Sequence, residues 1–132
     1  MMAEDRTVHT KHLGANRYRD LQVYYDKGGM NYWDYSNKPK GIYFATMLYT
    51  KSGGCRTWST GQKGDGYLLA VPLERYSAKQ LRLVRERVEV AAEQIHDIME
   101  GRYGSIAELK AYIKGEAALP AAPDVTALPE AA

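Results

Sequence analysis

Aromatic and basic residues gather in the stretch KGGMNYWDYSNKPKGIYF, at positions 27–44, where they are suited to contacts with another molecule. Tyr and Trp offer a large contact area at a small cost in side-chain entropy, and they dominate the energetics of many interfaces. The lysines among them suit an acidic protein surface or a single-stranded nucleic acid whose bases stack on the rings. Alternatively, the rings fold back onto the protein as a lid. The candidate partner-binding residues are Met30, Tyr32, Trp33, Tyr35, Lys38 and Lys40.

Residues with catalytic or metal-binding chemistry are few and scattered. Cys55 follows two glycines and precedes Arg56, and a neighbouring cation can activate a thiol. No sequence signature of a Cys/His enzyme accompanies it. His9 and His12 have the i, i+3 spacing of some metal ligands, but they stand in a polar segment without further ligands. The sequence therefore predicts a non-enzymatic protein without a cofactor or metal site, and a small enzyme that uses Cys55 is an alternative.

A second candidate site consists of cations at the start of a predicted helix. Acidic residues follow between positions 89 and 100, so the order of charges is the reverse of what the helix dipole favours. The pattern fits a solvated helix face with i, i+4 ion pairs, an anion or nucleic-acid site, or antiparallel self-pairing in a homodimer. His96 falls on the same polar face, and we expect it at the surface. The cations are Arg75, Lys79, Arg82 and Arg85.

The elements that must position these residues begin with an antiparallel sheet. Between Tyr18 and Tyr76, short alternating runs of apolar and aromatic residues are separated by glycine clusters, which predicts three or four strands. Residues 42–50 are apolar on both faces and therefore suit a central strand. Residues 55–60 and 67–73 flank the turn-forming GQKGDG and are expected to pair with each other, and Pro72 indicates a strand end or an edge.

Two helices follow the predicted sheet. Ser77 and Gln80 form a capping box that starts a helix running to about Glu100, and apolar residues recur along it at spacings of three and four. Ser105 begins a shorter helix over 105–113. The predicted fold is α+β: a three- or four-stranded antiparallel sheet packed against one long C-terminal helix plus a short helix.

Length and composition limit the domain organisation. The chain has 132 residues, 45% of them hydrophobic and 26% charged, which predicts one globular domain. We expect a flexible N-terminal lead at 1–15, the domain at 16–114 and a disordered Ala/Pro-rich tail at 115–132. The apolar runs are too short to cross a membrane, and the single cysteine fits a reducing compartment, so a cytoplasmic location is expected.

The aromatic stretch also resembles a family of small uncharacterised proteins encoded on plasmids, prophages and integrative elements. In that family a Gly-Gly-Met-Asn-Tyr block, here residues 28–32, precedes a Gly-aromatic-Tyr strand, here Gly41 and Tyr43 with Ile42 at the middle position. The resemblance covers roughly residues 24–76 and implies no established activity. It implies an accessory protein of a mobile genetic element, phage or plasmid, that binds host or element machinery. Inhibition of a host defence complex, of the anti-CRISPR kind, is one such activity.

Overall fold

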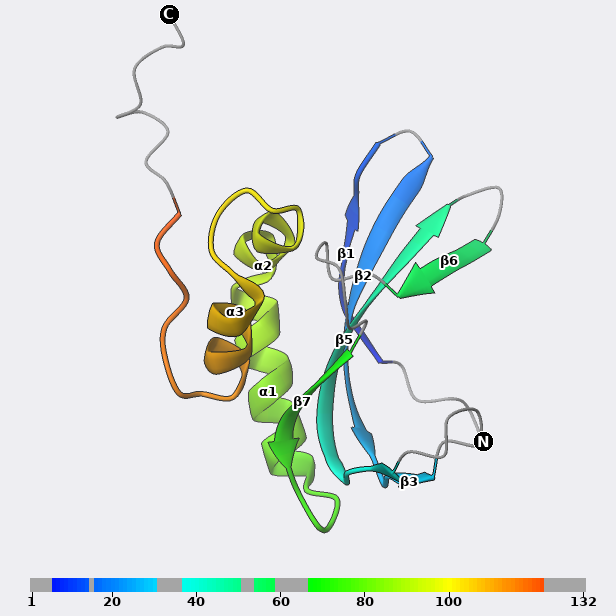
Figure 1. Ribbon diagram of the computed structural model, residues 1–132, viewed down its shortest axis with the longest axis vertical. Coiled ribbons are helices and arrows are strands. Elements are labelled where there is room, and N and C mark those ends of the chain that lie inside the picture. Colours follow the sequence, from blue (N-terminus) through cyan, green and yellow to red (C-terminus); the bar gives the residue numbers. More distant parts are fainter. Residues whose placement is uncertain (1–5, 15, 31–36, 51–53, 59–66, 123–132) are drawn as a thin grey trace, which may run out of the picture.

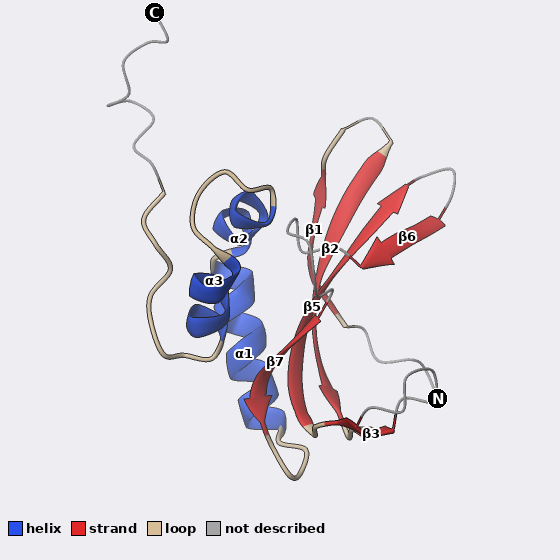
Figure 2. Ribbon diagram, in the orientation of Figure 1, coloured by secondary structure: helices blue, strands red, loops and turns tan. Residues whose placement is uncertain are grey.

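A five-stranded antiparallel sheet carries three helices on one face (Figures 1 and 2). The computed structural model describes residues 6–14, 16–30, 37–50, 54–58 and 67–122. The α+β prediction is confirmed. The strands are β1 (Thr7–His12), β2 (Arg17–Asp26), β5 (Gly41–Thr50), β6 (Gly54–Trp58) and β7 (Tyr67–Pro72), and β3 (Gly29–Met30) and β4 (Asn37–Lys38) form a separate two-stranded ribbon.

Strand β5 is the centre of the sheet, as its two-sided apolar sequence predicts. One edge of β5 pairs with β2 along its whole length, from Arg17 opposite Thr50 to Asp26 opposite Gly41. Its other edge pairs with β7 near the start of β5 and with β6 near its end. The prediction that β6 and β7 pair with each other is therefore wrong, because both lie along the same edge of β5. Strand β7 ends at Pro72, whose missing amide hydrogen is tolerated there.

The N-terminal segment differs from the expected flexible lead, because residues 7–12 form strand β1 beside β2. Its sequence, TVHTKH, has one large aliphatic residue, Val8, which packs against the core. An edge strand needs little more, because backbone pairing and polar contacts hold it. Thr10 donates a hydrogen bond to Asp20 at 2.7 Å, and the amide of Val23 donates to the carbonyl of Arg6 at 2.9 Å.

The expected single long helix is two helices, α1 (Ala78–Val90) and α2 (Ala92–Met99), followed by α3 (Ile106–Ile113). The break falls at Ala91, whose backbone (φ −113°, ψ 20°) leaves the helical region although neither Gly nor Pro is present. It coincides with a change in what the helices bury: α1 buries apolar side chains alone, whereas α2 buries His96 together with apolar ones. Tertiary packing has therefore overridden the continuous helical pattern. Both serine caps are confirmed, at Ser77 and Ser105.

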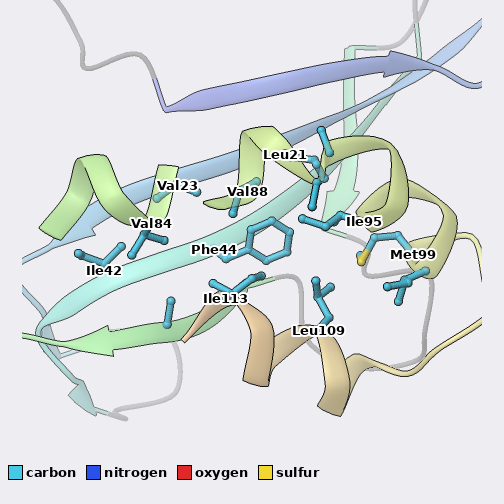
Figure 3. Packing of buried hydrophobic residues seen from close by; sticks show 14 of the residues in the cluster. Leu21, Val23, Ile42, Phe44, Val84, Val88, Ile95, Met99, Leu109 and Ile113 are labelled. Atoms are coloured by element: carbon cyan, nitrogen blue, oxygen red, sulfur yellow. The ribbon is translucent and has the colours of Figure 1, made fainter. Parts of the chain in front are cut away.

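The core lies between the helices and the helix-facing side of the sheet (Figure 3). Alternation along each strand brings Leu21 and Val23 of β2 and Ile42 and Phe44 of β5 to this side. The helices cover them with a continuous apolar stripe, which consists of Leu81, Val84, Val88, Ala91, Ala92, Ile95, Ile98, Met99, Leu109 and Ile113.

The segment after α3 is ordered against the domain as far as the structure describes it. Leu119 packs on the core, so the part of the expected disordered tail that the structure describes, residues 115–122, differs from the prediction. Arg87 donates a hydrogen bond to the carbonyl of Ile113 at 2.7 Å and joins α1 to the end of α3. Residues 123–132 of the predicted tail lie outside the described residues. Among the helices of the described chain, none is long and apolar enough to span a membrane.

Candidate functional site

The two ends of the predicted aromatic loop are paired as the β3–β4 ribbon. Gly29 lies opposite Lys38, and Met30 lies opposite Asn37. The backbone thus leaves and returns at adjacent points at one end of the sheet. Met30 is 52% exposed at the outer end of this ribbon. The predicted contact residues Tyr32, Trp33 and Tyr35 lie between these strands and outside the described residues.

Asp26 fixes the base of the loop. Its carboxylate accepts a hydrogen bond from the amide of Gly28 at 2.7 Å and lies 2.9 Å from the ammonium of Lys38. Burial alone would raise the pKa of Asp26, but the hydrogen bonds from Lys38 and Gly28 outweigh burial and lower it. Position 28 requires glycine, because φ is +75° and a Cβ would lie 2.4 Å from the carbonyl oxygen of Lys38.

A stack of rings and cations supports the same end of the sheet, on the face away from the helices. Tyr24 and Tyr43, directly opposite each other on β2 and β5, stack with their centroids 5.9 Å apart and their planes 16° apart. The guanidinium of Arg6 lies 4.1 Å from the Tyr24 centroid, and the ammonium of Lys38 lies 4.5 Å from that of Tyr43. Tyr43 also donates a hydrogen bond to the carbonyl of Pro39 at 2.6 Å. The β4 arm of the loop is therefore attached to this stack through Lys38 and Pro39.

The predicted helix cations have different roles. Arg75, Lys79 and Arg82 are exposed, whereas Arg85 is half-buried. Arg85 donates hydrogen bonds to the carbonyls of Val23 at 2.9 Å and Thr7 at 3.3 Å, so it ties α1 to β2 and β1. The four cations do not form one anion site, because one of them is used to hold the helix on the sheet.

A buried polar seam between α2 and the sheet was missed by the sequence analysis. His96, expected at the surface, is fully buried, and its Nε2 lies 3.1 Å from Nδ1 of His9 on β1. The expectation is wrong because the break at Ala91 separates α2 from α1 and the sheet covers this part of α2 with polar groups. Burial lowers the pKa of His96 to about 4, and the positive charges of His9, Arg19 and Lys11 act in the same direction.

An ion pair completes the polar seam. The buried guanidinium of Arg19 on β2 contacts the carboxylate of Glu100 after α2. Burial alone would raise the pKa of Glu100, but the hydrogen bond and charge of Arg19 outweigh burial and lower it. Lys11 lies 3.3 Å from Glu93, which is mostly exposed. Within the described part of the chain, Arg19 Nε and His96 Nδ1 are buried without a hydrogen-bond partner.

The seam does not meet the requirements of a metal centre. Nowhere in the described ranges do three or more His, Cys, Asp or Glu side chains gather as metal ligands. The predicted alternative nucleophile, Cys55, lies on β6 opposite Tyr49, and its side chain is outside the described part of the structure. No local signal predicts the seam, because His9 and His96 are 87 residues apart in the sequence.

Comparison of the chain with protein-family models, with curated proteins and with solved structures finds no match.

Proposed function

We propose that the protein is a non-enzymatic binding module that recognises a protein partner through the loop between β3 and β4. The observation that supports this proposal is the fixed base of the loop. Asp26, Lys38 and the Tyr24–Tyr43 stack hold both arms on the sheet. A loop held at both ends loses less conformational entropy on binding than a free one, and this favours affinity. The aromatic residues at 32, 33 and 35 are then the contact residues.

Charge pairing at the loop base favours a protein partner over nucleic acid. Lys38 is paired with Asp26, and Lys40 lies 4.0 Å from Glu74. Binding to a phosphate backbone depends on several cations that are available to release counterions. Lysines that already lie beside carboxylates contribute less to such binding, whereas Met30 and the loop aromatics suit an apolar protein contact.

The resemblance to mobile-element proteins supports a more specific form of the proposal. The partner is then a protein of the host or of the element, and binding blocks or redirects it, as an inhibitor of a host defence complex would. This form rests on residues 24–76 of the sequence. It concerns the identity of the partner, and the loop proposal stands without it.

Affinity purification with three versions of the chain tests the proposal. Wild type, Trp33→Ala and the control Lys110→Ala, an exposed change on α3, are expressed in the native host, and bound protein and nucleic acid are both analysed. We expect one protein to be retained stoichiometrically by wild type and Lys110→Ala and to be lost with Trp33→Ala. Retention of nucleic acid alone, with an affinity that falls steeply with salt, would contradict the protein-binding proposal. Equal retention by all three versions would contradict the role of the loop.

A further inference from the structure

A pocket of about 440 Å³ opens at the loop end of the sheet, where three parts of the described chain meet. Arg6 precedes β1, Tyr25 and Asp26 end β2, Lys27 follows β2, and Tyr76 lies in the connection between β7 and α1. In Figure 1 the loop end of the sheet is its lower end, near β3 and the start of α1. The pocket is separate from the polar seam under α2.

Two tyrosines form an aromatic wall of the pocket. Tyr25 and Tyr76 meet edge to face, with centroids 5.6 Å apart and planes at 80°. The hydroxyl of Tyr25 lies 3.5 Å from the carbonyl of Leu73, while Tyr76 is 58% exposed. An exposed ring beside a pocket offers a face on which another ring can stack.

The remaining charges of the pocket favour an anion. Among the described residues that line it, Asp26 is the one acidic side chain, and its carboxylate is already engaged by Lys38 and the amide of Gly28. Arg6 and Lys27 add two positive charges. The guanidinium of Arg6 is held in place over the Tyr24 ring, and an oriented guanidinium is well suited to two parallel hydrogen bonds with a carboxylate or phosphate.

We propose that this pocket binds an aromatic anion, a ring that carries a phosphate or carboxylate. The ring stacks on Tyr76, and the anionic group lies between Arg6 and Lys27. A free nucleotide and a phosphorylated tyrosine of a partner both have this chemistry. The proposal does not rest on the β3–β4 loop, because the lining residues named above lie outside β3 and β4. A small probe can therefore be tested on the isolated protein.

The test is a titration of the full chain with phenyl phosphate, followed by backbone amide shifts in NMR spectra. Inorganic phosphate and benzyl alcohol are titrated separately, because each has only half of the proposed chemistry. Variants Arg6→Gln, Lys27→Gln and Tyr76→Ala remove one contact each. Lys110→Gln is the matched control, because it removes an exposed lysine of α3 that does not line the pocket.

We expect saturable shifts at residues 25–27 and 76 with phenyl phosphate, and much weaker binding of the two half-probes. Each pocket variant weakens binding by about tenfold or more, the scale of one charged hydrogen bond or one stacked ring, and Lys110→Gln leaves it within about twofold. Adenosine monophosphate and a phosphotyrosine peptide then identify the source, because the natural ligand class binds more tightly. Absence of saturable shifts, equal binding of inorganic phosphate, or unchanged binding by Tyr76→Ala and Arg6→Gln would each overturn the proposal.

Discussion

The helix-facing side of the sheet and its loop end use the same kinds of residue in opposite ways. Under α1 and α2, the polar side chains have partners within the same chain. Arg85 contacts carbonyls, Arg19 contacts a carboxylate, and His96 contacts another imidazole. At the loop end, Lys27 and Tyr76 remain open beside a pocket, and Met30 extends from a paired stem. Groups with partners inside the chain stabilise the fold, whereas the open groups at the loop end belong to the proposed binding sites.

This difference shows why residue type alone does not separate structural cations from candidate binding cations. Arg85 belongs to a basic cluster in the sequence, but its hydrogen bonds to Val23 and Thr7 make it part of the helix–sheet junction. Arg6 stands in a segment that the sequence gives as a flexible lead, and it lies over Tyr24 and lines the pocket. A cation is available to bind an anion only if its N–H groups are not already taken up by carbonyls or carboxylates of the fold.

The largest effect is expected for a core residue on the helix-facing side. Phe44→Ala removes a fully buried ring between the sheet and the helices and should lower the free energy of unfolding by about 3–5 kcal/mol. Urea unfolding followed by circular dichroism measures the change. A loss below about 1 kcal/mol would mean that this side is not the tightly packed region of the molecule.

The next effect is a dependence of stability on pH that comes from the polar seam. The folded pKa of His96 is about 4, below its ordinary value of 6.5, so the unfolded chain binds this proton first as the pH falls. Stability is therefore full above about pH 6.5 and is lost progressively towards about pH 4, by about 3 kcal/mol in total. Urea unfolding across this range measures it.

Two substitutions test whether His96 is the source of this pH dependence of stability. His96→Leu should remove most of this slope, and His12→Leu, an exposed histidine on β1, should retain it. At lower pH the carboxyl of Glu100 adds to the loss, because its pKa is also lowered in the folded state and its stabilising charge disappears on protonation. An equal slope in wild type and His96→Leu would place the titration elsewhere.

A smaller effect is expected at the base of the loop. Lys38→Met keeps the apolar part of the side chain but removes its ion pair with Asp26, and it should cost about 1 kcal/mol because both groups are partly exposed. The larger consequence is for binding, since the β4 arm is then held less firmly. Partner affinity should fall while the pH dependence from His96 stays unchanged. A loss of stability as large as that of Phe44→Ala would show that the loop base belongs to the core.

The sequence predicts those parts of the fold that depend on local patterns. Alternating runs between Tyr18 and Tyr76 indicate the strands, and the apolar character of both faces of residues 42–50 indicates the central strand β5. The Ser77 and Ser105 caps placed the starts of α1 and α3 within one residue. Strand β1 has too few apolar residues to show such a pattern. The break at Ala91 carries no helix-breaking residue, so no local rule predicts it.

The candidate site could be predicted only in part, for the same physical reason. The glycines of residues 27–44 indicate a loop, and its two ends are paired in the structure, while the contact role of its aromatics stays a prediction. The pocket joins Arg6, Tyr25 and Tyr76, which are far apart in the sequence and meet only after the sheet and α1 have packed. Contacts between residues so far apart leave no periodic pattern in the amino-acid sequence.

The most direct test of the account is the effect of Trp33→Ala, measured beside Phe44→Ala for both thermal unfolding and partner affinity. If the loop is a binding element held at its base, Trp33→Ala should leave the melting temperature near that of wild type. Its affinity for the partner should fall by about 2 kcal/mol or more, the scale of a hot-spot aromatic. If Trp33→Ala instead lowers the melting temperature as much as Phe44→Ala, the loop is a lid on the core, and the proposed binding function is contradicted.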